Sequence, residues 1–183
     1  MLTLSDLERV APALLPHRST TVRPIDWEAL HTALGVALPA DYRAFADRYP
    51  ALWIDDVMIL RVPEPGAESA YVSGVFSINE EMEGLAEDDM TEDYTFHPAE
   101  GGLICWGATD QGDYFFWRRN GPDPDRWPAV VFSSRVYWWE HEGGFLALLV
   151  GLIDGSVEHS GLPPEPGPNP TIKLTVPASS SQE

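Results

Sequence analysis

The segment from residue 94 to residue 145 contains 13 of the chain's 20 aromatic residues, and this concentration constrains the fold most strongly. Two apolar stretches, 103–108 and 113–118, flank the turn residues 109–112, which is the pattern of a β-hairpin. The stretches 128–133 and 135–140 lie so close together that they predict a second hairpin. Because large rings belong in a core, we predict an antiparallel meander over 103–140 at the centre of the domain.

Helical patterns precede this meander. Ser5 and Glu8 have the spacing of a capping box, so a first helix is predicted from Ser5, and Pro12 should kink or shorten it. Asp26 is suited to cap a second helix, which Gly35 ends. The boundaries of two helices are thereby predicted from residues that have a defined effect on the backbone.

A third helix is predicted after Pro39, and a last helix follows the meander and ends at Gly155. Residues 53–62 are predicted to form a strand interrupted at Asp55-Asp56. The 183 residues suffice for one well-buried core. Helices, a meander and a helix in that order predict a single α+β domain whose sheet is mixed or mostly antiparallel, with helices packed around it.

The predicted domain covers residues 1–155, and residues 156–183 are predicted to form a proline-rich tail. Five prolines lie between residues 163 and 170, so a regular core segment is not expected there. Residues 171–176 could add an edge strand. We expect that removal of residues 161–183 changes the stability little.

The charge of the chain is strongly negative, with 29 acidic residues against 11 basic ones and a formal net charge of −18. Such a chain repels phosphate backbones, so direct binding of nucleic acid is a poor hypothesis and a basic protein partner is a better one. Residues 51–100 alone carry thirteen acids and one base, Arg61, for a net charge of −12. Solubility does not require such concentration, whereas steering of a basic partner benefits from it.

The acidic residues concentrate in a predicted surface helix over residues 78–93. The stretch lacks the alternating ligands and central glycine of an EF-hand calcium loop. It is either a solvated helix face or a surface that binds a partner. The candidate partner-binding residues are Glu80, Glu81, Glu83, Glu87, Asp88 and Asp89.

Trp138 is a further candidate for partner binding. In a strand, neighbouring side chains alternate between the two faces, so Trp138 should point away from Tyr137 and Trp139. Its ring is either covered by a helix or by the tail, or it is an exposed anchor for a partner.

The sequence offers little to catalysis, and we expect neither enzymatic activity nor a cofactor or metal site. A nucleophile elbow is lacking, the five histidines share no metal-ligand spacing, and the single cysteine, Cys105, lies in an apolar run typical of a core thiol. The two clusters a small hydrolase could use are Glu140-His141 and the pair Asp110 and Asp113. Strand ends and tight turns explain both clusters without catalysis.

The chain is expected to be cytoplasmic and to have no membrane partner. Its N-terminus has no basic region ahead of an apolar stretch, so a signal peptide is not predicted. The longest apolar run, residues 145–153, has nine residues, whereas a membrane span needs roughly twenty.

Two blocks of the sequence resemble the SUKH (Smi/Knr-type) superfamily. Residues 34–45, Leu-Gly-Val-Ala-Leu-Pro-Ala-Asp-Tyr-Arg-Ala-Phe, are similar to the family's opening motif. The later block comprises Trp106-Gly107, Thr109, Gly112-Asp113, Phe116-Trp117, Asp123-Pro124-Asp125 and Trp127-Pro128, and the helix that starts at Phe145 fits the end of the pattern. The resemblance covers residues 3–155. The chain departs at Tyr49-Pro50-Ala51, where the family usually has glycines.

The resemblance implies a single α+β domain whose motif residues form turns, caps and core aromatics. Bacterial members that look like this are commonly immunity proteins, which bind and neutralise toxins that are often nucleases. Fungal relatives act as interaction hubs in cell-wall regulation. We therefore expect a non-enzymatic protein that neutralises a basic, nuclease-type toxin by direct binding. The alternatives are a regulatory interaction module of the Smi/Knr type without a toxin, and a small hydrolase.

Overall fold

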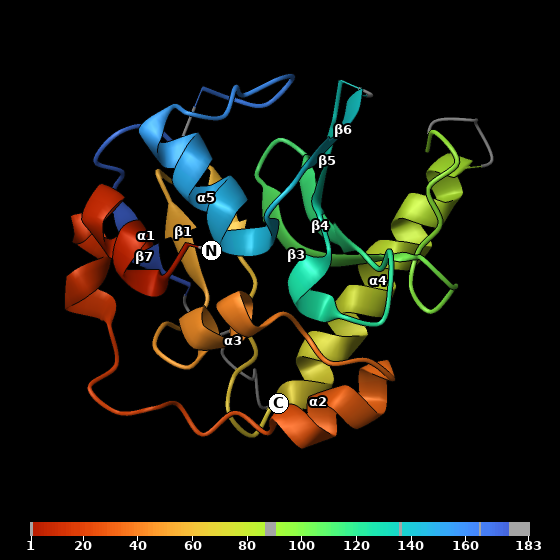
Figure 1. Cartoon of the computed structure of the whole chain (residues 1–183), viewed down its shortest axis with the longest axis horizontal. Helices are drawn as coiled ribbons and strands as arrows, with labels where there is room; N and C mark the ends of the chain where they lie inside the picture. The colour runs from red at the N-terminus through yellow and green to blue at the C-terminus, as the bar shows by residue number, and fades with distance from the viewer. Residues whose placement is uncertain (1, 87–90, 136, 165, 176–183) are drawn as a thin grey trace, which may run out of the picture.

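The computed structural model describes residues 2–86, 91–135, 137–164 and 166–175. Its helices are α1 (Leu4–Val10), the 3-10 helix η1 (Pro12–His17), α2 (Trp27–Leu34), α3 (Ala40–Ala46), α4 (Glu68–Ala86), the 3-10 helix η2 (Pro124–Arg126) and α5 (Gly144–Asp154). Its strands are β1 (Leu52–Ile54), β2 (Met58–Leu60), β3 (Leu103–Thr109), β4 (Tyr114–Arg118), β5 (Ala129–Ser133), β6 (Tyr137–His141) and β7 (Ile172–Leu174). These elements form a single α+β domain, as predicted (Figure 1).

The strands form one sheet in the order β6-β5-β4-β3-β2-β1-β7, and every neighbouring pair is antiparallel. The two predicted hairpins, β3–β4 and β5–β6, are confirmed. Residues 53–62 were expected to form one interrupted strand, but they contribute to a third hairpin, β1–β2. Asp55 and Asp56 make its turn with positive φ angles of 52° and 59°, a conformation that aspartate tolerates better than most residues.

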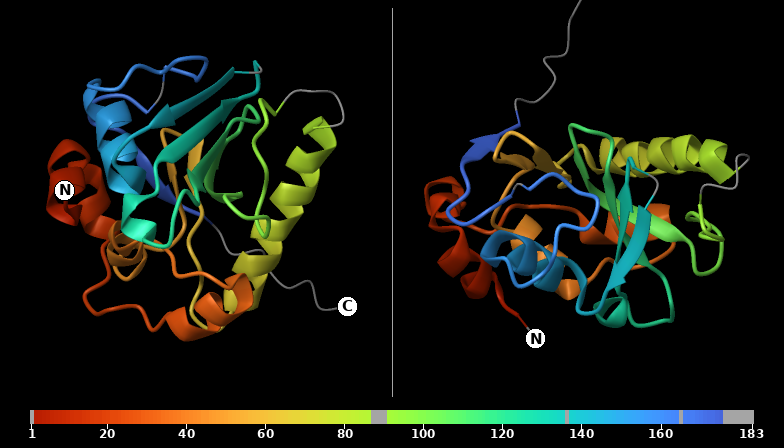
Figure 2. Two further views of the ribbon diagram at one scale, coloured as in Figure 1. Left: turned by 45° about the vertical axis from the view of Figure 1, so that its right-hand side comes forward. Right: turned by 90° about the horizontal axis from the view of Figure 1, so that it is seen from above.

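Helices α1, α3 and α5 cover one face of the sheet, where the main core lies (Figure 2). Trp106 and Trp117 of β3 and β4 are fully buried there. Tyr42 of α3 meets the Trp117 ring edge-on with 4.8 Å between ring centroids, and Phe145 of α5 meets the Trp106 ring in the same way at 5.0 Å. These aromatic contacts join the central strands to the helices.

A second core lies on the opposite face, beneath the C-terminal half of α4. Ile78 and Met82 of α4 pack there with Phe96, which belongs to the segment that returns from the helix to the sheet. The strands contribute Leu103, Cys105, Phe116, Val130, Phe132 and Trp138. Because alternate residues of the central strands face opposite ways, the sheet is buried on both sides.

Helix α1 begins at Leu4, and its N-cap is Thr3, two residues before the predicted cap Ser5. Asp6, rather than Glu8, is the carboxylate of the cap, and it accepts hydrogen bonds from the backbone N–H and the hydroxyl of Thr3 at 2.9 and 2.8 Å. Glu8 instead accepts from the Tyr49 hydroxyl at 2.8 Å. The predictions for α2 are confirmed, because the Asp26 side chain accepts from the Ala29 N–H and Gly35 ends the helix with φ of 69°.

Helix α4 differs most from the sequence-based expectation, which put a helix over residues 78–93. It begins ten residues earlier, at Glu68, and is followed through Ala86. Its buried positions Tyr71, Val75, Ile78 and Met82 are spaced four, three and four residues apart, as one face of a helix requires.

The described residues that follow α5, 155–164 and 166–175, make packing and hydrogen-bond contacts with the domain. Leu162 is buried, and Ser133 of β5 donates a hydrogen bond to the Gly161 carbonyl at 2.7 Å. Strand β7 lies within the segment 171–176 and pairs with β1, so it forms one edge of the sheet. These contacts argue against the expectation that removal of residues 161–183 changes the stability little, and truncation of the chain tests it.

Candidate functional site

Helix α4 exposes acidic candidate residues to solvent, because the opposite side of the helix is buried against the sheet. Glu80, Glu81 and Glu83 lie in its last two turns, and all three are exposed. Glu87, Asp88 and Asp89 lie outside the described residues. The structure thus brings three of the six predicted carboxylates together at the C-terminal end of one helix. We call Glu80, Glu81 and Glu83 the acidic helix end.

The acidic helix end has an unfavourable arrangement of charge. The last turn of α4 carries no basic residue, although the partial negative charge of a helix C-terminus favours lysine or arginine there. Glu80 and Glu83 are also three residues apart, at a spacing where like charges destabilise a helix. The carboxylates and the helix dipole therefore add to one another and produce a local negative potential.

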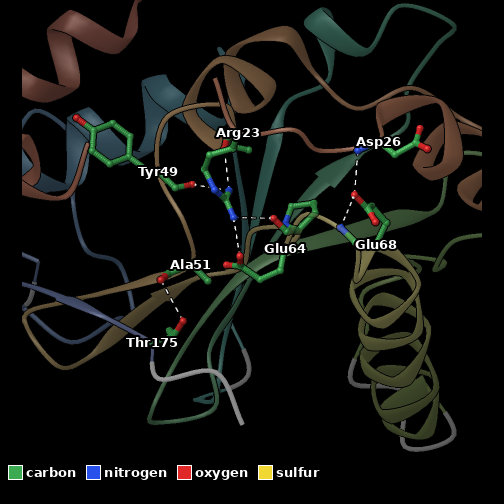
Figure 3. A network of polar contacts seen from close by, with 10 residues as sticks. Arg23, Asp26, Tyr49, Ala51, Glu64, Glu68 and Thr175 are labelled. Atoms are coloured by element: carbon green, nitrogen blue, oxygen red, sulfur yellow. Dashed lines mark hydrogen bonds and ion pairs between the residues drawn. The ribbon is translucent and has the colours of Figure 1, made fainter. Parts of the chain in front are cut away.

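Four other carboxylates of residues 51–100 make hydrogen bonds or ion pairs with residues that are distant in the sequence. Asp55 accepts from the Thr171 N–H at 2.7 Å, and Asp56 pairs with Lys173. Figure 3 shows the other two: Glu64 bonds Arg23 at 2.8 Å, and Glu68 accepts from the backbone of Asp26.

A second group of carboxylates in this segment makes no hydrogen bond or ion pair with any residue that the structure describes. This group comprises Glu80, Glu83, Glu92, Asp93 and Glu100. Most of it lies at the C-terminal end of α4 and in the turn at residues 92–93. The negative charge left uncompensated is therefore gathered at one end of the helix.

Glu81 has a partner within the described structure. Its carboxylate accepts a hydrogen bond from the Tyr114 hydroxyl at 3.0 Å. Burial and the neighbouring Glu81 charge together raise the pKa of Tyr114 to about 12. The contact fixes one carboxylate of the acidic helix end against β4.

Trp138 faces away from the main core, as its strand alternation predicts, but it is only 9% exposed. Its ring packs on Tyr94 at 4.9 Å and on Phe132 at 4.8 Å between centroids, in the second core. Of the two alternatives for this side chain, the structure favours the covered one. Trp138 is a core residue rather than an exposed anchor.

The structure places Asp110 and Asp113 in different environments. Asp113 is fully buried, and its carboxylate accepts from the Thr109 hydroxyl and from the Ser134 N–H at 2.8 Å. It thereby joins the β3–β4 turn to the β5–β6 turn. Asp110 is exposed to solvent, whereas Asp113 is already engaged by Thr109 and Ser134.

In the Glu140-His141 pair, the Glu140 carboxylate is engaged in contacts within the fold. Glu140 accepts from the Tyr94 hydroxyl at 2.8 Å and pairs with Arg118 at 2.9 Å. Burial lowers the pKa of His141, although Glu142 acts in the opposite sense. Because an arginine already binds Glu140, this carboxylate is poorly placed to exchange protons with a substrate.

Cys105 is fully buried, and that burial raises the pKa of its thiol to about 12. A thiol of this kind is a core side chain rather than a nucleophile. Within the part of the chain that the structure describes, no group of three or more His, Cys, Asp or Glu side chains is placed to hold a metal ion. Nor does any helix of that part have the length and apolar character that crossing a membrane requires.

A groove between α4 and the sheet, with Arg61 in its lining, was not anticipated from the sequence. The sequence does show that Arg61 is the one basic residue in the segment 51–100, which has a net charge of −12, and this could have marked it as a candidate. The depth of the groove depends on packing between distant elements, which no local pattern reports.

Comparison of the chain with models of known protein families, with curated proteins and with solved structures finds no match.

Proposed function

We propose that this protein is a non-enzymatic binding domain that neutralises a basic, nuclease-type toxin by direct contact. The observation that carries the proposal is the sorting of charge in residues 51–100. Acids at the N-terminal end of α4 are paired within the fold, whereas those at the acidic helix end and in the turn at residues 92–93 are mostly not. A surface of this kind attracts a basic partner at long range.

A nuclease suits such a surface because its active site must attract phosphate and is therefore basic. Carboxylates at the acidic helix end would compete with phosphate oxygens for the same lysine and arginine side chains. The partial negative charge of the helix C-terminus would reinforce this contact. Repulsion among the carboxylates of the acidic helix end lowers the stability of the free protein, and a bound basic partner would relieve that repulsion.

The resemblance to the SUKH superfamily supports the same proposal, since its motif residues have structural roles in this fold. Asp41 accepts from the Leu146 N–H at 3.0 Å and so joins α3 to α5. Asp125 accepts from the Ala40 N–H at 2.6 Å at the start of α3. Trp127 is buried and donates to the Gly121 carbonyl at 2.9 Å. Because these motif residues are engaged within the fold, we expect other surface residues to recognise the partner.

The test is to purify the protein encoded by the gene adjacent to this one and to assay its nuclease activity with increasing amounts of this chain. We expect inhibition that is complete at a one-to-one ratio. The triple variant Glu80→Gln, Glu81→Gln, Glu83→Gln should need a higher concentration, because its association is slower.

The matched control carries the same change of charge elsewhere, at the exposed residues Glu28, Glu142 and Glu158. It should inhibit like the wild type. Binding without any loss of the partner's activity would instead favour a regulatory interaction module. Absence of binding would refute the toxin proposal.

A further inference from the structure

The groove between the sheet and the N-terminal half of α4 has a volume of about 480 Å³. This is within the usual range for small-molecule sites, roughly 300–1,000 Å³. Its lining residues are Ala51, Ile59, Arg61, Val62, Glu64, Ala67, Ala70, Tyr71 and Thr175. Most of these are apolar. Three of the lining residues, Ala51, Glu64 and Thr175, are labelled in Figure 3.

Arg61 is the charged group that this groove leaves uncompensated. Its side chain makes no hydrogen bond or ion pair with any described residue, and its Nε atom is buried. The one carboxylate among the described lining residues, Glu64, is already bound to Arg23 at 2.8 Å. Nε itself is closed off from solvent, so an anion in the groove would meet the Nη end of the guanidinium, which has no acceptor among the described residues.

The fold makes room for this guanidinium. Gly74 lies in the interior of α4, where glycine is less favourable than alanine. A Cβ atom added there would overlap Nη2 of Arg61, so the missing side chain leaves the space that the guanidinium occupies. The arginine is therefore held between the helix and the sheet rather than extended into water.

The remaining polar groups of the groove are already used. The Tyr71 hydroxyl lies 3.2 Å from that of Tyr42, which donates to the Arg61 carbonyl at 2.6 Å. The Thr175 hydroxyl donates to the Ala51 carbonyl at 3.0 Å. A ligand would therefore meet apolar walls and one cation.

We propose that this groove binds a small apolar carboxylic acid, with its carboxylate on the Arg61 guanidinium and its hydrocarbon body along Ile59, Val62 and Ala70. A single charge matches the single arginine. Phosphates and other multiply charged anions are disfavoured because the groove offers them one cation, Arg61, and its other charged lining residue is the carboxylate of Glu64. The site is separate from the acidic helix end and does not depend on the toxin proposal.

Titration calorimetry with octanoate, and with octanamide as the uncharged analogue, tests the site in the full-length protein. Octanoate should bind saturably with one-to-one stoichiometry, and octanamide at least about tenfold more weakly, since hydrogen bonds to a charged group are the stronger kind. Arg61→Gln should lower the affinity for octanoate to that for octanamide. Arg9→Gln, which makes the same change of charge at an exposed residue, should bind octanoate like the wild type.

Gly74→Ala is the second variant, and it keeps the test valid if Arg61→Gln does not fold. Alanine favours the helix, but its methyl group displaces the guanidinium, so octanoate affinity should fall several-fold. Equal affinity of the wild type for octanoate and octanamide, or full affinity in Arg61→Gln, would overturn the proposal. So would binding of an apolar peptide through its free C-terminal carboxylate without binding of octanoate, because the site would then recognise a protein terminus.

Discussion

Replacement of Asp113 by alanine should destabilise the fold substantially, although sequence alone makes this residue a catalytic candidate. The side chain is fully buried, and its carboxylate accepts from the Thr109 hydroxyl and the Ser134 N–H. Loss of the charged acceptor for the buried Thr109 hydroxyl should cost about 1.5–3 kcal/mol. The Ser134 N–H is only partly buried and can turn to water, so its loss adds about 0.5–1 kcal/mol.

The expected loss is therefore about 2–4 kcal/mol in the free energy of unfolding, measured by urea denaturation followed through tryptophan fluorescence. The midpoint should fall while the m-value stays constant. Asp113→Asn should lose less, because its amide oxygen can still accept from the Ser134 N–H.

Asp110→Ala is the matched control, since Asp110 belongs to the same turn but is exposed. Its free energy of unfolding should stay within about 0.5 kcal/mol of the wild type. The reasoning is refuted if the two alanine variants unfold at the same urea concentration.

Three further predictions concern the second core, the pH dependence and the tail. Trp138→Ala should lower the free energy of unfolding by about 3–5 kcal/mol in urea denaturation, yet leave the association rate with a partner unchanged, because the ring is buried. Burial and the nearby Arg119 charge lower the pKa of His97, so the unfolded chain binds more protons than the folded chain. The free energy of unfolding should therefore fall as the pH drops below about 6.5, the ordinary pKa of histidine. His97→Asn should flatten this pH dependence in unfolding curves measured from about pH 7.5 to about pH 5.5. Truncation after Pro170 removes β7 and should lower the free energy of unfolding by about 2 kcal/mol or more in thermal unfolding. The β1 edge that it uncovers should also promote aggregation. Unchanged stability would mean that β7 is dispensable.

Local signals in the sequence were reliable where one residue determines one backbone feature. Asp26 and Gly35 marked the ends of α2 correctly because a cap needs only its own helix. The start of α1 was misplaced because Thr3-x-x-Asp6 and Ser5-x-x-Glu8 satisfy the same pattern, and Glu8 is drawn to Tyr49, 41 residues away. A local motif cannot report that competition.

Features that depend on distant packing escaped sequence-based prediction. The first half of α4 was missed because Gly74 and several serines weaken its helical pattern, although the spacing of Tyr71, Val75, Ile78 and Met82 carried the signal. Alternation placed Trp138 on the correct face but could not show that Tyr94 covers it. Whether a carboxylate such as Glu64 is paired or available likewise depends on a residue, Arg23, far away in the chain.

The most direct test of the central proposal is the association rate of this chain with its basic partner across a salt series. All six candidate carboxylates, Glu80, Glu81, Glu83, Glu87, Asp88 and Asp89, are changed to glutamine or asparagine, and circular dichroism confirms that the variant folds. At low salt we expect association to slow by about tenfold or more, and its salt dependence to flatten, since screening acts over a Debye length of about 8 Å at physiological ionic strength. An unchanged rate and salt dependence would contradict the proposal and leave the acidic helix end as a solvated face.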